Sequence, residues 1–214
     1  MKKIVILGAG GFGREVKMLI DQINAVENKY EFIGYYDDGK EKGEKINGFP
    51  ILGNTSDLND VQEPISVALA LGNPIHKKKV VQQLHNSNIT FATLIHPSAI
   101  IGNDCITIGQ GTVICAGCII TCNIDIQDYV IINLACTIGH DTIIKNYVSL
   151  MPGINVSGEV VLEEGAYVGT GAKIINQLTI GQNSIIGAGA VVSKSIPDNC
   201  TAVGIPAKPI KFHE

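Results

Sequence analysis

The stretch from Ile132 to Leu150 reads INLACTIGHDTIIKNYVSL, and an aliphatic residue returns in it at every sixth place. The same spacing continues in both directions and gives fifteen consecutive positions that all carry Ile, Leu or Val. If these residue types filled roughly a third of positions at random, such a run would have odds of about one in ten million. The positions are Ile108, Ile114, Ile120, Ile126, Ile132, Ile138, Ile144, Leu150, Val156, Leu162, Val168, Ile174, Ile180, Ile186 and Val192.

A second, smaller residue stands two places before many of these positions. Each six-residue unit therefore predicts a short flat strand and a corner, and three units close a coil of about eighteen residues. Stacked coils form a three-sided β-solenoid with an aliphatic interior. Between Ile101 and Ile108 the spacing is seven, so the first coil is expected to carry one extra residue. The smaller residues include Thr112, Cys118, Cys136, Thr142, Ala166, Ala172, Ser184 and Ala190.

The N-terminal part of the chain has a different pattern. Apolar runs over 3–7, 31–36 and 66–71 predict strands, and amphipathic runs over 11–23 and 75–88 predict helices. This alternation predicts a small parallel α/β domain, Rossmann-like, over residues 1–90, with ligands at the carboxyl ends of its strands. The solenoid domain is expected over 91–206, followed by a C-terminal tail over 207–214.

Composition limits the partners and the compartment. The 214 residues carry 16 Lys plus Arg against 20 Asp plus Glu, and this net charge of −4 argues against nucleic acid as a partner. No run approaches the roughly 18 apolar residues that a membrane span requires. The first residues lack a signal-peptide cleavage site, and the six Cys are expected as reduced thiols, so the predicted location is the cytoplasm.

A glycine-rich turn follows the first predicted strand. Residues 7–15 read LGAGGFGRE and place G-x-G-x-x-G between a strand and a helix, where backbone amides can bind phosphate. Acidic residues end the second predicted strand and a Gly-Asn pair ends a later one. Because the carboxyl ends of parallel strands meet at one edge of the sheet, both groups should line the same crevice. NAD is one candidate ligand, although a domain this short suits a mononucleotide or a nucleotide sugar better, and a turn without a ligand is the alternative. The predicted contacts are Gly10, Gly11, Phe12, Gly13, Asp37, Asp38, Gly72 and Asn73.

His140 is the only one of the five His residues within the uninterrupted repeat. It stands two places after the inward Ile138, so its ring is expected at a corner and facing outward. One coil later comes Gly158, which leaves room beside the ring and an uncovered amide for a ligand or an oxyanion. Asp141 could orient the imidazole and raise its basicity, which makes the pair a candidate general base. An exposed His-Asp pair on a turn is the alternative.

Other residues suggest sites that the repeat argues against. Cys115-x-x-Cys118 invites a zinc site, but its two thiols fall in different phases of the repeat and should point apart, so no metal is expected. His96 before Pro97 predicts the entry to the solenoid. The lysines over 77–79 predict a solvated helix face, and Lys208 is either a contact for a coenzyme A phosphate or a surface residue.

The repeat resembles the hexapeptide-repeat acyltransferases over roughly 95–206. That resemblance implies a left-handed parallel β-helix and a homotrimer, with acyl-CoA in the groove between neighbouring prisms. The whole chain resembles one subgroup, the PglD-type and NeuD-type sugar acetyltransferases. The motifs that carry the resemblance lie at 8–14, 37–38, 71–73, 96–97, 139–141 and 203–208.

This resemblance implies direct transfer of acetyl from acetyl-CoA to the amine of a nucleotide-linked 4-amino sugar, with UDP as the expected nucleotide. It makes His140 the base and Asp141 its partner. It also places Asn133 in the site and implies that Gly158 and Ala188 contact acetyl-CoA. Some relatives carry a second His nine places after the first, where this chain has Ser149.

Three rival readings stay open at this point. The first is O-acetylation of a sialic acid or another sugar hydroxyl. The second is a non-catalytic nucleotide-binding scaffold. The third is a metal hydratase on the same solenoid, which would need several converging His where the repeat offers one.

Overall fold

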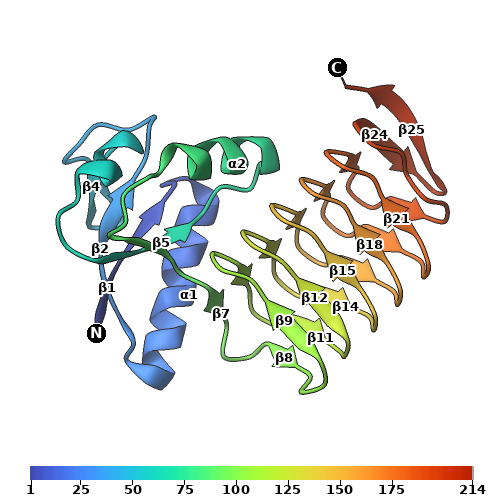
Figure 1. The fold of residues 1–214 in the computed structure, drawn as a ribbon, viewed down its shortest axis with the longest axis horizontal. Helices are drawn as coiled ribbons and strands as arrows, with labels where there is room; N and C mark the ends of the chain where they lie inside the picture. The colour runs from blue at the N-terminus through green and yellow to red at the C-terminus, as the bar shows by residue number, and fades with distance from the viewer. Residues whose placement is uncertain (214) are drawn as a thin grey trace.

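The computed structural model describes residues 1–213 and shows a small α/β domain followed by a three-sided β-solenoid (Figure 1), which confirms the predicted fold class. The α/β domain holds one sheet in the order β3-β4-β2-β1-β5-β6, parallel except for the β3–β4 hairpin. Its elements are β1 (Lys2–Leu7), α1 (Gly11–Glu27), β2 (Tyr30–Tyr36), β3 (Lys45–Ile46), β4 (Phe49–Gly53), the 3₁₀ helix η1 (Ser56–Asp60), β5 (Ile65–Leu69), α2 (Pro74–Gln83) and β6 (Ile89–Phe91).

Both helices end at places that differ from the prediction. α1 continues one turn further and ends where Asn28 adopts a left-handed conformation with φ 49°. α2 ends five residues before the predicted end, because the residues that follow it bond to the segment around η1 instead of continuing the helix. Asn59 Oδ1 accepts from the His85 amide at 2.9 Å, and Asn86 Nδ2 donates to the Val61 carbonyl at 2.8 Å. The β3–β4 hairpin, η1 and β6 were not predicted.

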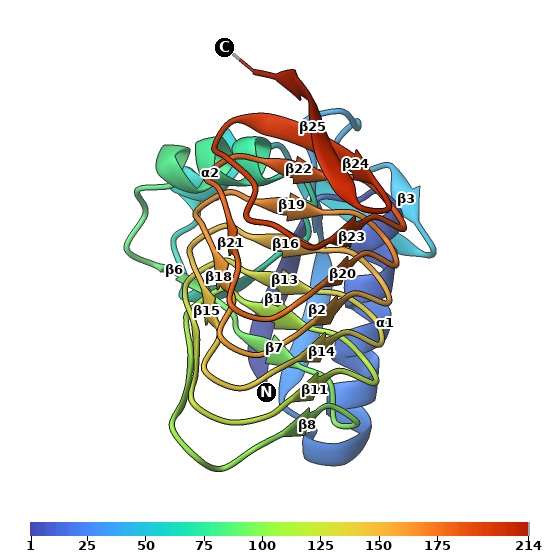
Figure 2. The same ribbon diagram turned by 90° about the vertical axis from the view of Figure 1, so that its right-hand side faces the viewer.

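The coils of the solenoid are built from two- and three-residue strands that stack in parallel on three faces (Figure 2), and two longer strands, β24 and β25, end the first face. Ile131 pairs with Ser149 eighteen residues later, whereas Ile101 pairs with Ile120 nineteen later, which confirms the extra residue in the first coil. The first face holds β7 (Leu94–Ile95), β10 (Val113–Ile114), β13 (Ile131–Ile132), β16 (Ser149–Leu150), β19 (Tyr167–Val168), β22 (Ile185–Ile186), β24 (Cys200–Gly204) and β25 (Ala207–Phe212).

The other two faces have the same stacked arrangement. The second face holds β8 (Ile100–Ile101), β11 (Ile119–Ile120), β14 (Thr137–Ile138), β17 (Asn155–Val156), β20 (Lys173–Ile174) and β23 (Val191–Val192). The third face holds β9 (Ile106–Ile108), β12 (Ile124–Ile126), β15 (Ile143–Ile144), β18 (Val161–Leu162) and β21 (Thr179–Ile180).

The repeat residues fill the prism as predicted. Fourteen of the fifteen are at most 3% exposed, and Ile108, near the open end of the first coil, is half-buried. The eight smaller residues of the second phase are at most 1% exposed. Each fully buried aliphatic side chain stabilises the fold by about 1.5–3 kcal/mol, so the stacked interior fixes the position of every corner.

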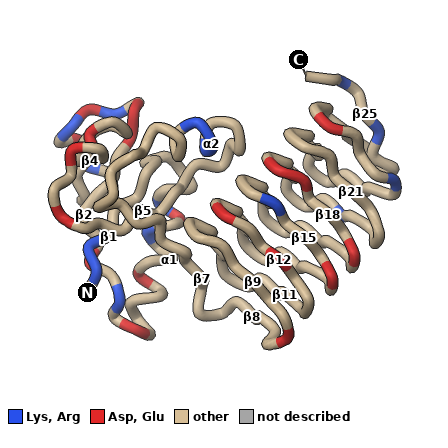
Figure 3. Tube along the Cα trace, viewed as in Figure 1, with Lys and Arg blue, Asp and Glu red and all other residues tan. Residues whose placement is uncertain are grey.

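The α/β domain packs against the first face of the solenoid. Apolar residues of α1 share a buried cluster with Leu94 and Val113. From α2, Lys77 is 1% exposed and its Nζ donates to Ser149 Oγ at 3.0 Å, while Lys78 pairs with Glu164 at 2.6 Å. Lys77 and Lys78 therefore contact the coils whereas Lys79 is exposed, and for Lys77 the prediction of a solvated helix face was wrong. Figure 3 shows the basic stretch of α2 in blue.

The last residues form a strand where a tail was expected. β25 pairs antiparallel with β24, and Lys208 lies opposite Val203. Neither helix in residues 1–213 combines the length and apolarity that crossing a bilayer demands.

Candidate active site

His140 lies at the corner between the second and third faces, in the turn from β14 to β15. Asp141 follows it with a left-handed φ of 57°, and this turn lets two neighbouring side chains converge. His140 Nδ1 lies 2.7 Å from Asp141 Oδ2, and the two side chains are 57% and 48% exposed. Asn123, one coil earlier at the same corner, donates from Nδ2 to Asp141 Oδ1 at 3.1 Å.

The surroundings of Asp141 set the state of the imidazole. The hydrogen bonds from His140 and Asn123 hold the pKa of the Asp141 carboxyl below its ordinary value, so this group is ionised at neutral pH. An ionised carboxylate accepts a hydrogen bond from Nδ1–H, which assigns the proton to Nδ1 and leaves Nε2 as a proton acceptor. The pair therefore has the arrangement of an oriented base.

Gly158 lies directly against the His140 ring. A Cβ at Gly158 would come within 2.5 Å of both Cε1 and Nε2, so any side chain here would displace the imidazole. The adjacent Glu159 amide donates to the His140 carbonyl at 2.8 Å and ties the two coils together. The Gly158 amide itself donates no hydrogen bond within residues 1–213 and is available to a ligand.

Two acidic residues follow the end of β2, and the first of them, Asp37, holds the glycine-rich turn. Asp37 Oδ2 accepts from the Ala9 amide at 2.7 Å, and Asp38 Oδ1 accepts from the Thr55 amide at 2.7 Å. A crevice of about 100 Å³ lies here, lined among others by Gly8, Asp37 and Asp38. We call it the nucleotide crevice after the ligand expected from the sequence, since it lies at the carboxyl ends of β1 and β2.

The other predicted residues of the α/β domain have distinct positions. Gly10 and Gly11 are exposed and face open space, whereas a side chain at Gly13 would collide with the Gly8 carbonyl oxygen. Phe12 is half-buried against the core of the domain. Gly72 also faces open space. The exposed Asn73 caps α2, and its Oδ1 accepts from the His76 amide at 3.1 Å.

Several predicted residues lie away from His140 in the same chain. Asn133 is 5% exposed at the corner between the first and second faces, where its Oδ1 accepts from the Leu134 amide at 2.7 Å. Ala188 is exposed at that same corner three coils higher, and Lys208 is exposed on β25. Ser149 is fully buried on the first face against Lys77.

The α/β domain and His140 occupy opposite sides of the prism. The domain covers the first face, and His140 lies on the edge where the other two faces meet. The nucleotide crevice and the imidazole therefore do not meet within one chain.

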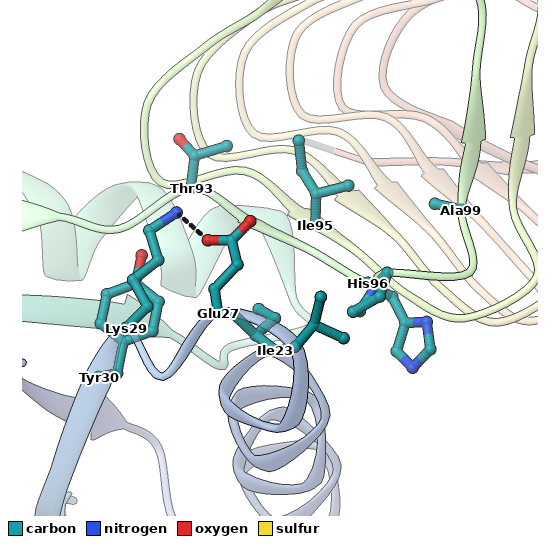
Figure 4. A pocket seen from close by; sticks show the side chains of 10 residues that line it. Ile23, Glu27, Lys29, Tyr30, Thr93, Ile95, His96 and Ala99 are labelled. Atoms are coloured by element: carbon teal, nitrogen blue, oxygen red, sulfur yellow. Dashed lines mark ion pairs between the residues drawn. The ribbon is translucent and has the colours of Figure 1, made fainter.

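His96 connects the two domains. It lines a cavity of about 430 Å³ between the end of α1 and the first coil (Figure 4). Its Nε2 lies 2.9 Å from Gln22 Oε1, and its Nδ1 accepts from the Ser98 amide at 2.9 Å. Both ring nitrogens are used, which agrees with the interpretation of His96 as the entry to the solenoid.

The cysteines are divided as the repeat predicts. Cys118 and Cys136 lie inside the prism, whereas Cys115 joins the cluster between the domains, where burial raises the pKa of its thiol to about 12. No group of three or more His, Cys, Asp or Glu side chains in residues 1–213 is arranged to hold a metal ion.

Two residues around these sites were missed from the sequence. Asn123 carries a usable signal, because it stands one coil before Asp141 at the same corner. Lys77 carries none, since one buried lysine in a row of three cannot be distinguished by composition.

Comparison with known families places both domains. The family model described as PglD N-terminal domain matches residues 3–84, and the model for bacterial transferase hexapeptide (six repeats) matches residues 159–194. UDP-N-acetylbacillosamine N-acetyltransferase of Bacillus subtilis (strain 168) is 39% identical over 122 residues, 54% of this chain and 52% of that relative. The match thus spans about half of the curated relative.

Solved structures match over nearly the full length. The acetyltransferase domain of PglB from Neisseria gonorrhoeae FA1090 is 32% identical with a TM-score of 0.89, covering 98% of this chain and 100% of that chain. Its complex with acetyl coenzyme A is 33% identical with a TM-score of 0.88, covering 98% and 99%. A mutant perosamine N-acetyltransferase from Caulobacter crescentus, with CoA and GDP-perosamine bound, is 27% identical with a TM-score of 0.86, covering 99% and 98%.

Likeness at this identity over the whole chain, together with the solenoid and the α/β domain in the same order, decides the family. The chain belongs to the PglD-type acetyltransferases that are built on hexapeptide repeats.

Proposed function

We propose that this protein transfers acetyl from acetyl-CoA to the amine of a nucleotide-linked 4-amino sugar, with UDP as the expected nucleotide. The observation that carries the proposal is the His140–Asp141 pair, whose free Nε2 lies at an open corner against Gly158. Relatives named for acetylation of bacillosamine and perosamine support the acceptor class. Acetyl-CoA and CoA complexes among the structural neighbours support the donor.

The proposed reaction is a direct transfer. The amine attacks the thioester carbon while His140 Nε2 takes its proton, and Asp141 stabilises the imidazolium that forms. The carbon–sulfur bond then breaks, and the proton passes from His140 to the departing thiolate. The unbonded amide of Gly158 is available to stabilise the oxyanion between these two steps.

The proposed assembly is a homotrimer whose active sites lie between subunits. The separation of His140 from the nucleotide crevice supports it, because a second copy must bring the two together. In this assignment Gly10, Gly11, Gly13, Asp37 and Asp38 hold the nucleotide of one subunit beside His140 of the next. Gly158, Ala188 and Lys208 are the proposed contacts for acetyl-CoA, and Asn133 for the acceptor. Six unpaired cysteines support a cytoplasmic reaction.

The test is a steady-state assay of thiol release from acetyl-CoA with the purified protein. Acceptors are UDP-, GDP- and dTDP-linked 4-amino sugars, with sialic acid and neutral sugar hydroxyls as rivals. We expect turnover with an amino sugar and a loss of about 10²–10⁴-fold in His140→Ala. Turnover with hydroxyl acceptors alone, or undiminished turnover in His140→Ala, would overturn the proposal.

A further inference from the structure

A second cavity of about 450 Å³ lies between α2 and the upper coils of the first face. We call it the interdomain cavity. Its volume lies in the range of small-molecule pockets, about 300–1,000 Å³. The first turn of α2 forms one wall, and β19, β22 and the C-terminal residues form the other. The lining residues that matter below are Asn73, Ile75, Tyr167, Asn183, Ile185 and Asn199.

The interdomain cavity and the nucleotide crevice lie on two sides of one short segment. Leu71 and His76 line the nucleotide crevice, whereas Asn73 and Ile75, between them in sequence, line the interdomain cavity. A ligand whose nucleotide lies in the crevice therefore has the cavity one helix turn away. The cavity offers space for the rest of such a ligand.

The walls of the interdomain cavity offer two kinds of surface. Ile75 and Ile185 are 68% and 36% exposed, so both leave apolar surface uncovered. Asn73 uses its Oδ1 to cap α2, and its amide nitrogen donates to no group in residues 1–213. The Tyr167 hydroxyl likewise has no hydrogen-bond partner within the described chain. A ring with hydroxyl or amide groups on one edge and a methyl on the other matches these surfaces.

Gly165 leaves room for the Asn183 side chain in the wall of the interdomain cavity. A Cβ at Gly165 would come within 2.5 Å of Asn183 Oδ1, and its φ of +71° also disfavours a side chain. The Asn183 amide donates to Asn199 Oδ1 at 3.3 Å and keeps its own oxygen for a ligand. No Lys or Arg lines the cavity, although every Lys and Arg of the chain lies within the described residues. The lining also holds His213, whose Nε2 lies 3.1 Å from Thr201 Oγ1, so a sugar carboxylate here would meet no permanently charged cation.

We propose that the interdomain cavity receives the sugar ring of the nucleotide-linked acceptor, and that Tyr167, Asn183 and Ile185 determine which sugar is accepted. This inference rests on the proposed function, because it needs a nucleotide sugar as the substrate. It adds residues on the first face of the solenoid to a site whose reacting imidazole comes from another subunit.

The test compares binding of UDP-N-acetylbacillosamine and of UDP by calorimetry in the full-length protein. We expect Ile185→Ser to weaken binding of the nucleotide sugar about 10-fold and Tyr167→Phe about 5-fold, with binding of UDP unchanged in both. Ile119→Ser is the matched control, since Ile119 is 41% exposed on the second face and should leave both affinities unchanged.

Steady-state kinetics complete the design. If Ile185→Ser raises KM for acetyl-CoA and leaves binding of the sugar unchanged, the cavity belongs to the donor and the inference is wrong. Equal weakening of UDP and of the nucleotide sugar would also contradict it. His140→Ala separates this inference from the proposed function, because that variant should lose transfer while binding both probes as the unmodified protein does.

Discussion

Gly158→Ala is the substitution in which the structure predicts the largest functional effect from the smallest chemical change. The new Cβ would lie 2.5 Å from His140 Nε2 and Cε1 and 2.9 Å from Cδ2. Ordinary contact between such atoms needs about 3.5 Å, so the ring or the coil must move by about 1 Å. The ring moves more easily, because it is on the exposed side of the corner.

That displacement should be costly for catalysis and mild for folding. A misplacement of about 1 Å in a reacting group can lower turnover about 10²-fold. Gly158 does not have a positive φ, so alanine brings no backbone strain, and His140 is 57% exposed, so its ring can swing into solvent. We therefore expect kcat/KM to fall about 100-fold with Tm nearly unchanged. The hydrogen bond to Asp141 should weaken, and the pKa of Asp141 should rise towards its ordinary value.

The assay combines acetyl-transfer kinetics, thermal unfolding and NMR titration of the Asp141 carboxyl. Asn176→Ala is the matched control, because Asn176 is exposed at the same corner one coil beyond Gly158. Unchanged turnover in Gly158→Ala would refute the assignment of this corner as the reaction site. A large drop in Tm would show that the glycine serves the stacking of the coils instead.

Three further predictions concern other parts of the molecule. Asp141→Asn should lower kcat about 10- to 100-fold with KM for acetyl-CoA unchanged. Because the pKa of Asp141 lies below its ordinary 3.8 in the folded chain, the pair stabilises the fold above about pH 4. An acid titration of Tm should show this contribution fading below that pH in the unmodified protein and not in Asp141→Asn. Burial lowers the pKa of Lys77 well below its ordinary 10.5, so the unfolded chain binds that proton more tightly. Between the folded and unfolded pKa values, stability should therefore rise by about 1.4 kcal/mol per pH unit towards pH 10.5. Lys77→Met with Ser149→Ala should raise Tm at pH 7 and flatten that rise in a series of melts. A lower Tm would count against a cost of burying an amine that has hydrogen bonds but no acidic partner. Gly10→Glu should abolish binding of UDP in calorimetry with Tm preserved, since Gly10 faces open space at the turn proposed to bind phosphate, and retained binding would place the nucleotide elsewhere.

The sequence predicted the solenoid well because its signal is local and repeated. A residue such as Ile138 is buried wherever the period of six places it, so the corner of His140 follows from counting. The outward position of the imidazole and its contact with Gly158 follow in the same way. Asn123 was within reach of that argument, because it stacks one coil before Asp141.

What the sequence did not predict depends on contacts between distant segments. Lys77 is buried because α2 docks on β16, and nothing in three successive lysines indicates which one faces the coils. The end of α2 is set by Asn59 and Asn86, whose partners lie in another part of the α/β domain. The family resemblance places Asn133 in one site with His140, and because the two lie at different corners of the prism, that prediction requires a second subunit.

The central claim is that each active site combines His140 of one subunit with the nucleotide crevice of another, and mixing two inactive variants tests it most directly. His140→Ala and Gly10→Glu chains are unfolded together, refolded as mixed oligomers at equal amounts, and assayed for acetyl transfer. Random assembly into a ring places an intact imidazole beside an intact crevice in about a quarter of the sites, so about a quarter of the unmodified activity should return. Mixed oligomers that remain inactive would contradict the claim, because a site contained within one chain cannot be restored by its neighbour.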